Sequence, residues 1–408
     1  MQKSQAKFIF VSNYINHHQI PFCNAMYALL GGDFMFCQTQ AVEQERIAMG
    51  WAEGHELPYL VMYGENPEEV QTQIDNCQVV FFGGTDDESF IQHRLQSRKT
   101  VIRYSERLYK TGQWKAISPR GLRKKYLDHT RYRKEPVFML CSGGYVPSDF
   151  HIVRAYPDKL LKWGYFPETK HYDVDKLMAG KKPHSILWAA RMIDWKHPDL
   201  PVRVASYLKK KNLPFIMTII GGGELERQVR ALAEELDVMD VVQFAGYQKP
   251  ENVREYMEKA EIFLVTSDRQ EGWGAVVNEA MNSGCAVVAN HMIGAVPYLV
   301  SHGRDGMIYK DGDVDDLCGL VEQLLQNAEL VQRLGRNAYE KITECWNAEN
   351  AARQLARLCI RQGFLQEKDF PGIKEASLSA IKEMPQSGPC SVAPVVPERK
   401  MYARLVKR

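Results

Sequence analysis

The chain has 408 residues, more than the roughly 100 to 200 of one ordinary domain, so we expect two domains. Hydrophobic residues make up 45%, charged residues 25%, and the net charge is +2, a balance that excludes general disorder. No apolar stretch approaches the roughly 20 residues that span a bilayer, and no signal peptide opens the chain, so we expect a cytoplasmic protein. Nine scattered cysteines without a CxxC pair favour neither a disulfide framework nor a zinc site.

Short apolar runs alternate with longer amphipathic stretches in the first half of the chain, as strands alternate with helices in an α/β domain. The runs lie at Lys7–Val11, Val79–Phe82, Val101–Tyr104 and Val137–Cys141. A polar stretch without periodicity follows at 169–184, and its Lys-Lys-Pro favours a domain boundary there.

The second half repeats the alternation with runs that are apolar at nearly every position, which is typical of strands buried on both faces of a parallel sheet. The runs lie at Ser185–Ala190, Phe215–Ile220, Val241–Phe244, Ile262–Val265 and Ala286–Ala289, with helices expected at Leu225–Leu236 and Ala275–Ser283. We therefore expect two doubly wound α/β domains, with ligands bound at the carboxyl ends of their strands. The expected organisation is an N-terminal domain, 1–168; a connector, 169–184; a C-terminal domain, 185–346; a helix that packs back on the N-terminal domain, 347–376; and a poorly ordered Ser- and Pro-rich tail, 377–408.

Two features at the start of the second domain suit an anionic ligand. The glycine turn, Gly221-Gly222-Gly223-Glu224, follows a strand and opens a helix, so backbone N–H groups there can face a diphosphate. A tight strand-to-helix turn without a ligand explains the glycines equally well. Arg191 and Lys196 follow the strand Ser185–Ala190 and can neutralise a leaving diphosphate, although a surface ion pair also explains them.

The stretch from Glu271 to Glu279, EGWGAVVNE, carries the strongest signal. A glycine-bracketed loop opens a helix, and the two carboxylates lie eight residues apart, about two helical turns. Both carboxylates can hold sugar or ribose hydroxyls, while N–H groups at Gly274 and Ala275 face phosphates. Acids near a helix start also occur for dipole reasons alone.

These residues together resemble a known family. The stretch from Ser185 to Asp311 is similar to the nucleotide-binding domain of the retaining glycosyltransferases of family 4, the glycosyl transferases group 1, which have the GT-B fold. The two cations, the glycine turn and the two glutamates occur in the family's order and spacing, and the segments 291–300 and 302–306 also match its pattern. The resemblance implies a GT-B fold, two Rossmann-like doubly wound domains facing a central cleft.

The resemblance also implies an activity and a site. It implies a retaining hexosyltransferase that takes a sugar from a nucleoside-diphosphate sugar, UDP before GDP, and needs neither metal nor cofactor. The acceptor implied is a glycan or lipid-linked molecule in cell-surface polysaccharide or lipopolysaccharide synthesis. The implied catalytic residues are Arg191 and Lys196, on the donor diphosphate, and Glu271, on the transferred sugar. The implied donor-binding residues are Gly221, Gly222, Gly223, Glu224, Gly272, Gly274, Ala275, Val276 and Glu279, the last on the ribose.

The N-terminal half resembles the family only in outline. The segment Ser12 to Phe22 replaces the family's glycine-rich loop after the first strand, and 163–168 replaces its Asn-Gly-Val-Asp. Asn16, His17 and His18 leave a strand's carboxyl end, so they are candidates for the acceptor site, while a capping or packing role suits the histidines equally well. The acceptor and any general base stay open.

Residues 94–134 form a basic segment with fourteen Lys and Arg against two acids, Glu106 and Asp128, interleaved with aromatic residues. Such a segment attracts an anionic membrane surface, a pyrophosphate-linked lipid or a phosphorylated glycan. We expect docking at the inner face of the membrane, and no nucleic acid, since no recognised nucleic-acid module frames the segment. A solvated loop whose charges meet acids from elsewhere is the alternative.

Two Asp-Val-Asp motifs, at Asp173 and Asp313, raise the question of a metal, but the second begins a helix, where aspartate caps free N–H groups. Two rival functions keep the fold: a nucleotide-sugar epimerase or hydrolase, and a non-catalytic glycan-binding scaffold. A nicotinamide dehydrogenase is disfavoured, because the chain lacks the GxGxxG fingerprint and the acidic residue that binds a dinucleotide ribose.

Overall fold

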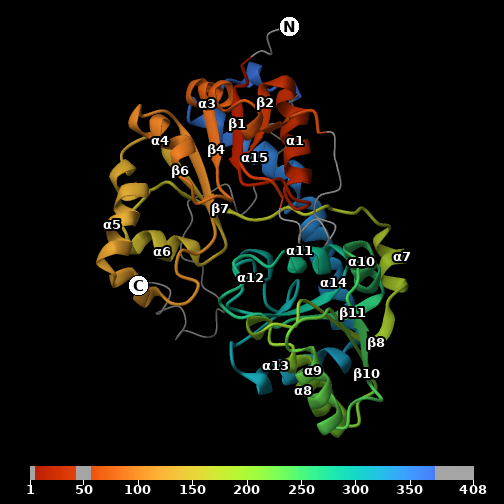
Figure 1. The fold of residues 1–408 in the computed structure, drawn as a ribbon. Helices are drawn as coiled ribbons and strands as arrows, with labels where there is room; N and C mark the ends of the chain where they lie inside the picture. Colours follow the sequence, from red (N-terminus) through yellow and green to blue (C-terminus); the bar gives the residue numbers. More distant parts are fainter. Residues whose placement is uncertain (1–4, 43–56, 373–408) are drawn as a thin grey trace. The chain divides into compact units, whose positions relative to one another are not determined.

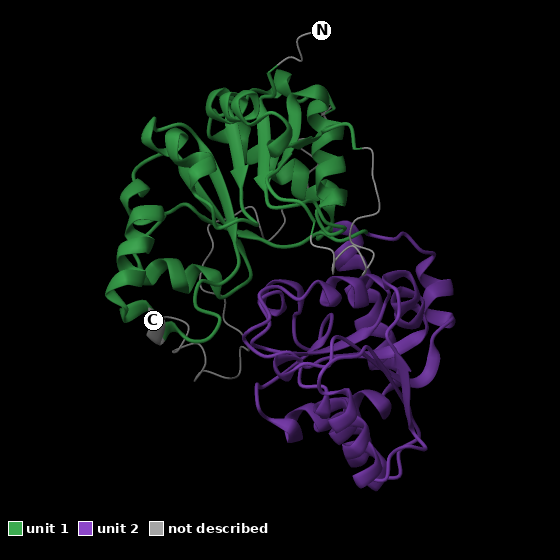
Figure 2. Cartoon of the chain, viewed as in Figure 1, with its two compact units in different colours: residues 1–168, 345–392, 407–408 green, residues 169–344, 393–406 purple. Residues whose placement is uncertain are grey.

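The structure is a computed structural model that describes residues 5–42 and 57–372. Of these residues, unit 1 contains 5–168 and 345–372, and unit 2 contains 169–344. Figure 2 colours the two units separately, and each is a parallel β-sheet covered by helices (Figure 1). The tail expected at 377–408 lies outside the described residues.

The sheet of unit 1 has the strand order β3-β2-β1-β4-β5-β6-β7, with every neighbouring pair parallel. The order reverses beside β1, the first strand, which lies between β2 and β4 and is buried at every position. A doubly wound sheet binds ligands where its order reverses, at the carboxyl ends of the strands. The strands are β1 (Phe8–Ser12), β2 (Phe34–Gln38), β3 (Leu60–Met62), β4 (Val79–Phe82), β5 (Val101–Ser105), β6 (Val137–Ser142) and β7 (Leu160–Trp163).

The helices of unit 1 come from both ends of the described chain. They are α1 (Ile20–Leu30), α3 (Pro67–Asn76), α4 (Ser89–Gln96), α5 (Pro119–Asp128), α6 (Val146–Ile152) and α15 (Ala348–Arg361). Helix α15, blue in Figure 1, packs against α1 near the red start of the chain, and it buries Ala351, Leu355 and Cys359. A salt bridge of 3.1 Å between Lys7 and Asp369 adds a second connection. Residues 345–372 thus complete unit 1.

The sheet of unit 2 repeats the plan, with the order β10-β9-β8-β11-β12-β13 and its reversal between β8 and β11. Its strands are β8 (Lys182–Ala189), β9 (Ile216–Ile220), β10 (Val242–Gly246), β11 (Ala260–Val265), β12 (Ala286–Asn290) and β13 (Met307–Tyr309). Its helices are α7 (Val174–Ala179), α8 (Asp199–Lys210), α9 (Glu226–Glu235), α10 (Pro250–Lys259), α11 (Ala275–Asn282), α12 (Val296–Leu299), α13 (Val314–Leu325) and α14 (Ala328–Glu344).

The expected connector at 169–184 is not a structureless linker. It contains α7 and the first residues of β8, and it belongs to unit 2. Leu177 and Met178 of α7 are buried beside Gly284 and Gly335, where an added side-chain carbon would meet Met178. Two buried residues are too few to give a helical period in the sequence, so this helix was not expected. No helix within 5–42 and 57–372 is long and apolar enough to cross a membrane.

Candidate functional site

The loops that follow β8 and β11 meet at the reversal point of unit 2. Thr266 accepts a 2.7 Å hydrogen bond from the indole of Trp188 and donates one of 2.6 Å to the carbonyl of Lys196. The backbone N–H of Asp268 donates to the carbonyl of Trp195 at 3.0 Å. These bonds hold the loop that carries Lys196 against the loop that carries Glu271.

Lys196 and Glu271 form an ion pair between these loops. Each side chain is only 13% exposed, so both charges are largely withdrawn from water and interact more strongly than a surface pair does. Arg191 leaves the end of β8 on the same loop and is exposed. The structure therefore brings Lys196 and Glu271 together, and it leaves the Arg191 guanidinium accessible at the same edge of the sheet.

The glycine turn, Gly221 to Glu224, is shaped by the loop that carries Arg191. Gly221 has φ +129°, and a side-chain carbon there would overlap the carbonyl oxygen of Ala190. A carbon on Gly223, which has φ +150°, would lie 2.6 Å from the carbonyl oxygen of Met192. The Met192 N–H donates to the Gly222 carbonyl at 2.8 Å. Close backbone packing thus accounts for two of the three glycines, while Gly223 and Glu224 stay exposed.

Helix α11 begins at Ala275, immediately after Gly274. Gly274 has a left-handed φ of +92°, and an added side-chain carbon would lie 2.9 Å from Ile293 and 3.3 Å from Glu271. Gly272 is buried, and Val276 and Glu279 are half-buried in or beside the helix. Burial raises the pKa of Glu279, and the charge of Arg254 opposes this shift. The helix start therefore lies directly behind Glu271, and its N–H groups favour an anion.

Sequence reasoning missed a second pair between the same two loops. His197 and Asp268 lie 3.5 Å apart, with His197 in a left-handed conformation that ends the short turn Asp194–Lys196. The hydrogen bond to Asp268 raises the pKa of His197. Burial opposes ionisation of Asp268, but its hydrogen bonds with His197 and Gln270 outweigh burial and lower its pKa. In the sequence, only the position of His197 next to Lys196 indicated that His197 lies at this site.

Unit 1 contains a cavity of about 660 Å³ at the carboxyl edge of its sheet. Residues that follow β1, β4, β5 and β7 line it, which is where the strand order reverses. Gly83 and Gly84 let these strand ends approach, because a side-chain carbon on Gly84 would overlap the hydroxyl of Ser12. Gln19 donates a 3.0 Å hydrogen bond to Tyr104 across the cavity floor. A volume of this size suits a small ligand such as a sugar.

Two of the three proposed acceptor residues line this cavity. Asn16 and His18 are lining residues, and His17 lies against His18 with ring centroids 3.8 Å apart. The Asn16 side chain also accepts from the N–H groups of His18 and Gln19, at 3.0 and 3.2 Å, and so shapes the turn into α1. Burial, and then the neighbouring His17, lowers the pKa of His18 to about 3, so its ring is neutral at physiological pH.

The cavity also holds charged residues that sequence reasoning did not place there. Glu106 accepts a 2.6 Å hydrogen bond from Tyr165 and pairs with Lys110. Arg107 pairs at 3.5 Å with Asp149, which is fully buried. Lys125 reaches the cavity from α5, and burial lowers its pKa. Position after β5 was the only signal for a place of Glu106 in the cavity, because Tyr165 comes from a distant segment.

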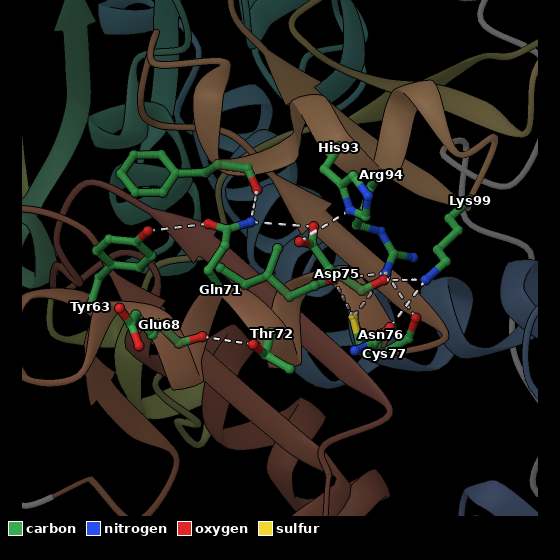
Figure 3. Close-up of polar contacts among 12 residues, drawn as sticks. Tyr63, Glu68, Gln71, Thr72, Asp75, Asn76, Cys77, His93, Arg94 and Lys99 are labelled. Carbon is green, nitrogen blue, oxygen red and sulfur yellow. Dashed lines mark hydrogen bonds and ion pairs between the residues drawn. The ribbon is translucent and has the colours of Figure 1, made fainter.

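The basic segment 94–134 is not one surface. Arg94 is fully buried, and it donates 2.8 Å hydrogen bonds to the carbonyls of Ile74 and Cys77 at the end of α3 (Figure 3). Lys99 donates to the carbonyl of Asp75 at 2.6 Å. Arg103 is also buried and pairs with Glu88. These side chains satisfy carbonyls and acids inside unit 1, so the charge available at the surface is smaller than the sequence indicates.

Both Asp-Val-Asp motifs cap helices. Asp173 accepts from the N–H groups of Asp175 and Lys176 at the start of α7, each at 3.2 Å. Asp313 accepts from the N–H of Asp316 at the start of α13, at 3.1 Å. The cap predicted for Asp313 is confirmed, and Asp173 has the same role.

Comparison with known proteins finds a family-model match within unit 2 and longer matches to individual glycosyltransferases. Residues 172–341 match the family model described as glycosyl transferases group 1. The chain is 30% identical over 199 residues to the amylovoran biosynthesis glycosyltransferase AmsK of Erwinia amylovora, covering 48% of this chain and 49% of that protein. It is 26% identical over 183 residues to a GDP-mannose-dependent phosphatidylinositol monomannoside mannosyltransferase of Mycobacterium tuberculosis, covering 43% and 47%. The chain thus spans about half the length of the curated relatives it matches.

Comparison of structures covers both units. The Anabaena protein HepE, solved in complex with UDP, matches with a TM-score of 0.64 over 87% of this chain and 100% of that chain, at 13% identity. WaaG, a glycosyltransferase involved in lipopolysaccharide biosynthesis, matches with a TM-score of 0.53 over 85% and 98%, at 15% identity. These likenesses confirm the GT-B fold. The match to the group 1 family model, 172–341, lies within unit 2.

Proposed function

We propose that this chain is a retaining glycosyltransferase, of the family 4 type, that transfers a hexose from a nucleoside-diphosphate sugar to a glycan or lipid-linked acceptor. One observation carries the proposal: Lys196 and Glu271 pair at the reversal point of unit 2, next to Arg191 and the start of α11. A cation, a carboxylate and a helix N-terminus at one edge suit the diphosphate and the sugar of such a donor.

The protein's main task in this reaction is to stabilise the leaving diphosphate. Arg191 and Lys196 supply positive charge, and the N–H groups at the start of α11 supply fixed dipoles, so no divalent ion is needed in the proposed mechanism. Glu271 is released from Lys196 when the diphosphate takes its place and then contacts the transferred sugar. Glu279 holds the ribose. UDP is the favoured nucleotide, with GDP next.

Unit 1 holds the acceptor in the proposed reaction. Its cavity is lined by two carboxylates, Asp86 and Glu106, and three cations, which suits an acceptor with both hydroxyl groups and an anionic group. The names of AmsK and WaaG refer to amylovoran and lipopolysaccharide biosynthesis, and this supports cell-surface polysaccharide assembly as the setting.

Thermal shift against UDP, GDP, ADP, CMP, their sugar conjugates and NAD tests the donor. One nucleotide should stabilise the protein, by about 2.7 kcal/mol at a hundredfold excess over its dissociation constant. Arg191→Ala and Glu279→Ala should weaken that stabilisation, whereas Lys210→Ala and Glu235→Ala, at exposed positions on α8 and α9, should not. Stabilisation by no nucleotide sugar would overturn the proposal and favour a scaffold.

Turnover with and without acceptor separates the transferase from its rival. Donor consumption that requires an added acceptor supports transfer, and an NMR spectrum showing the donor's anomeric configuration in the product supports retention. Equal donor consumption without acceptor would favour the epimerase or hydrolase.

A further inference from the structure

Four large apolar side chains project into solvent around helix α5 of unit 1. Ile117 is 80% exposed, Leu122 41%, Tyr126 56% and Leu127 39%. Across the described residues the other exposed large hydrophobics are scattered over unit 2, at Ile216, Met239, Tyr247 and Tyr256. Isolated exposed apolar residues are ordinary, but a cluster within one short stretch marks an interaction surface.

Helix α5 lacks the packing that normally stabilises a short helix. Its ten residues include none that is buried, whereas α3 buries Val70 and Ile74 and α4 buries Ile91 and Leu95. Helices of this length are marginal in water and depend on an apolar face covered by something else. Ser118 caps α5, and Pro119 begins it, so its start is defined without a core contact. Figure 1 shows α5 at the outer edge of unit 1.

Basic side chains lie beside the apolar ones. Residues 117–134 contain seven Lys and Arg against one acid, Asp128, which pairs with Lys124 at 2.9 Å. The exposed members are Arg120, Arg123, Lys124, Arg131, Arg133 and Lys134. Unlike Arg94 and Arg103, these cations are not withdrawn into the unit. The surface charge expected for the whole segment 94–134 is therefore concentrated at its C-terminal half.

The helical spacing places the two kinds of side chain next to each other. Leu122 and Tyr126 are four residues apart and share one stripe of α5. Arg123 and Leu127 form the adjoining stripe. Helices that lie in a membrane interface have this construction, with apolar tips entering the headgroup layer and cations contacting anionic headgroups.

We propose that α5 and Ile117, two residues before its start, form a docking surface for an anionic lipid bilayer. Ile117, Leu122, Tyr126 and Leu127 enter the headgroup region, and Arg120 and Arg123 contact the lipid phosphates. A nucleic acid would meet the same cations but would leave the aliphatic tips uncovered in water, so a lipid surface fits the observed mixture better. Lys125 of α5 also lines the cavity of unit 1, so docking brings this cavity to the lipid surface.

Co-sedimentation of the full chain with vesicles tests the docking surface directly. The vesicles are pure phosphatidylcholine or a mixture of phosphatidylcholine and phosphatidylglycerol. The protein should bind the anionic mixture, more weakly as salt increases, and should not bind pure phosphatidylcholine. Arg120→Glu with Arg123→Glu should weaken binding at least about tenfold. Leu122→Ser with Tyr126→Ser, which keeps every charge, should weaken it by about tenfold.

Matched variants in unit 2 serve as controls. Lys210→Glu with Arg333→Glu makes the same charge change, and Met239→Ser with Tyr256→Ser removes exposed apolar groups; neither should alter binding. Circular dichroism confirms folding, and Arg120→Gln with Arg123→Gln replaces the charge reversal if that variant unfolds. The assay needs no sugar donor, so its outcome is independent of the proposed reaction. No binding to the anionic vesicles, binding unchanged in either α5 variant, or equal weakening by the controls would overturn the proposal.

Discussion

Units 1 and 2 arrange their strands in the same order around a first central strand, yet different interactions hold the loops together at the carboxyl ends of the strands. In unit 2, close backbone packing fixes the glycine turn at Gly221 and Gly223 against the loop after β8, and the pair Lys196–Glu271 fixes that loop against the loop after β11. In unit 1, side chains such as Gln19 and Tyr104 connect the loops around a cavity. The shared topology determines where a site forms, and the loops determine what it binds.

The largest effect is expected from removing the ion pair of unit 2. Lys196→Ala removes a cation from the developing diphosphate, so donor turnover should fall about 100- to 1000-fold. Initial rates with saturating acceptor measure this loss. Lys210→Ala, an exposed lysine on α8, should keep the rate of the unaltered protein. A fall of less than threefold in the rate of donor turnover by Lys196→Ala would show that Lys196 does not take part in the reaction.

A pair of glycine variants separates backbone packing from ligand contact in unit 2. Gly221→Ala introduces a carbon that overlaps the Ala190 carbonyl at a positive φ, so the free energy of unfolding should fall by about 2 to 4 kcal/mol. Gly222→Ala meets only the flexible Glu226 carboxylate, at 3.2 Å, and should cost less than about 1 kcal/mol. Denaturant titration measures both. Equal losses would show that packing against the Arg191 loop does not explain the turn.

A carboxylate variant in unit 1 tests whether the two edges have separate tasks. Glu106→Gln removes the charge that Tyr165 and Lys110 contact, so transfer to acceptor should fall about tenfold, a loss typical of one charged hydrogen bond. Stabilisation by the nucleotide should not change, because unit 2 is unaltered. Glu65→Gln, at an exposed position of the same unit, is the control. A loss of nucleotide stabilisation in Glu106→Gln would contradict the division.

The smallest effect is expected from the pair His197–Asp268. The raised pKa of His197 stabilises the folded protein at pH values below the pKa of His197 in the unfolded state. This stabilisation is lost as the pH rises through the pKa of His197 in the folded state. The lowered pKa of Asp268 adds stability that is lost as pH falls through its folded pKa. The unaltered protein should therefore have a larger free energy of unfolding than His197→Gln, and this difference should be greatest near about pH 5 to 6 and absent by about pH 9.

This difference in the free energy of unfolding should not exceed about 1 kcal/mol, because the His197 side chain is 36% exposed and solvent screens its interaction with Asp268. Asp199 and Asp311 also face His197 and contribute to its shift. Melting temperatures of both proteins across this pH range measure the difference, and a constant difference would show that ionisation of the pair is not involved.

The sequence predicted the long buried strands and failed on short elements. Runs such as Ser185–Ala190 and Ile262–Val265 are apolar throughout, and they became β8 and β11. Strand β13 has three residues, and α7 buries only two, so neither carries a readable period.

The candidate site divides in the same way. Sequence reasoning selected Arg191, Lys196, Glu271 and Glu279 as candidates because they lie in two short segments with a recognisable spacing. Glu106 and Asp268 were missed because their partners, Tyr165 and His197, are distant in the chain, and only folding brings them together. The charge of Arg94 was misplaced for the same reason, since its partners are backbone carbonyls that no composition reveals.

The late position of α15 in the chain affects the order in which the two units can fold during synthesis. Residues 345–372 belong to unit 1, and the ribosome synthesises them only after residues 169–344 of unit 2. Unit 2 can therefore finish folding first, and the surface of α1 that α15 covers stays exposed until α15 has been synthesised. A chain cut after residue 344 would leave this surface exposed to chaperones and proteases. Helix α15 thus determines when unit 1 becomes stable.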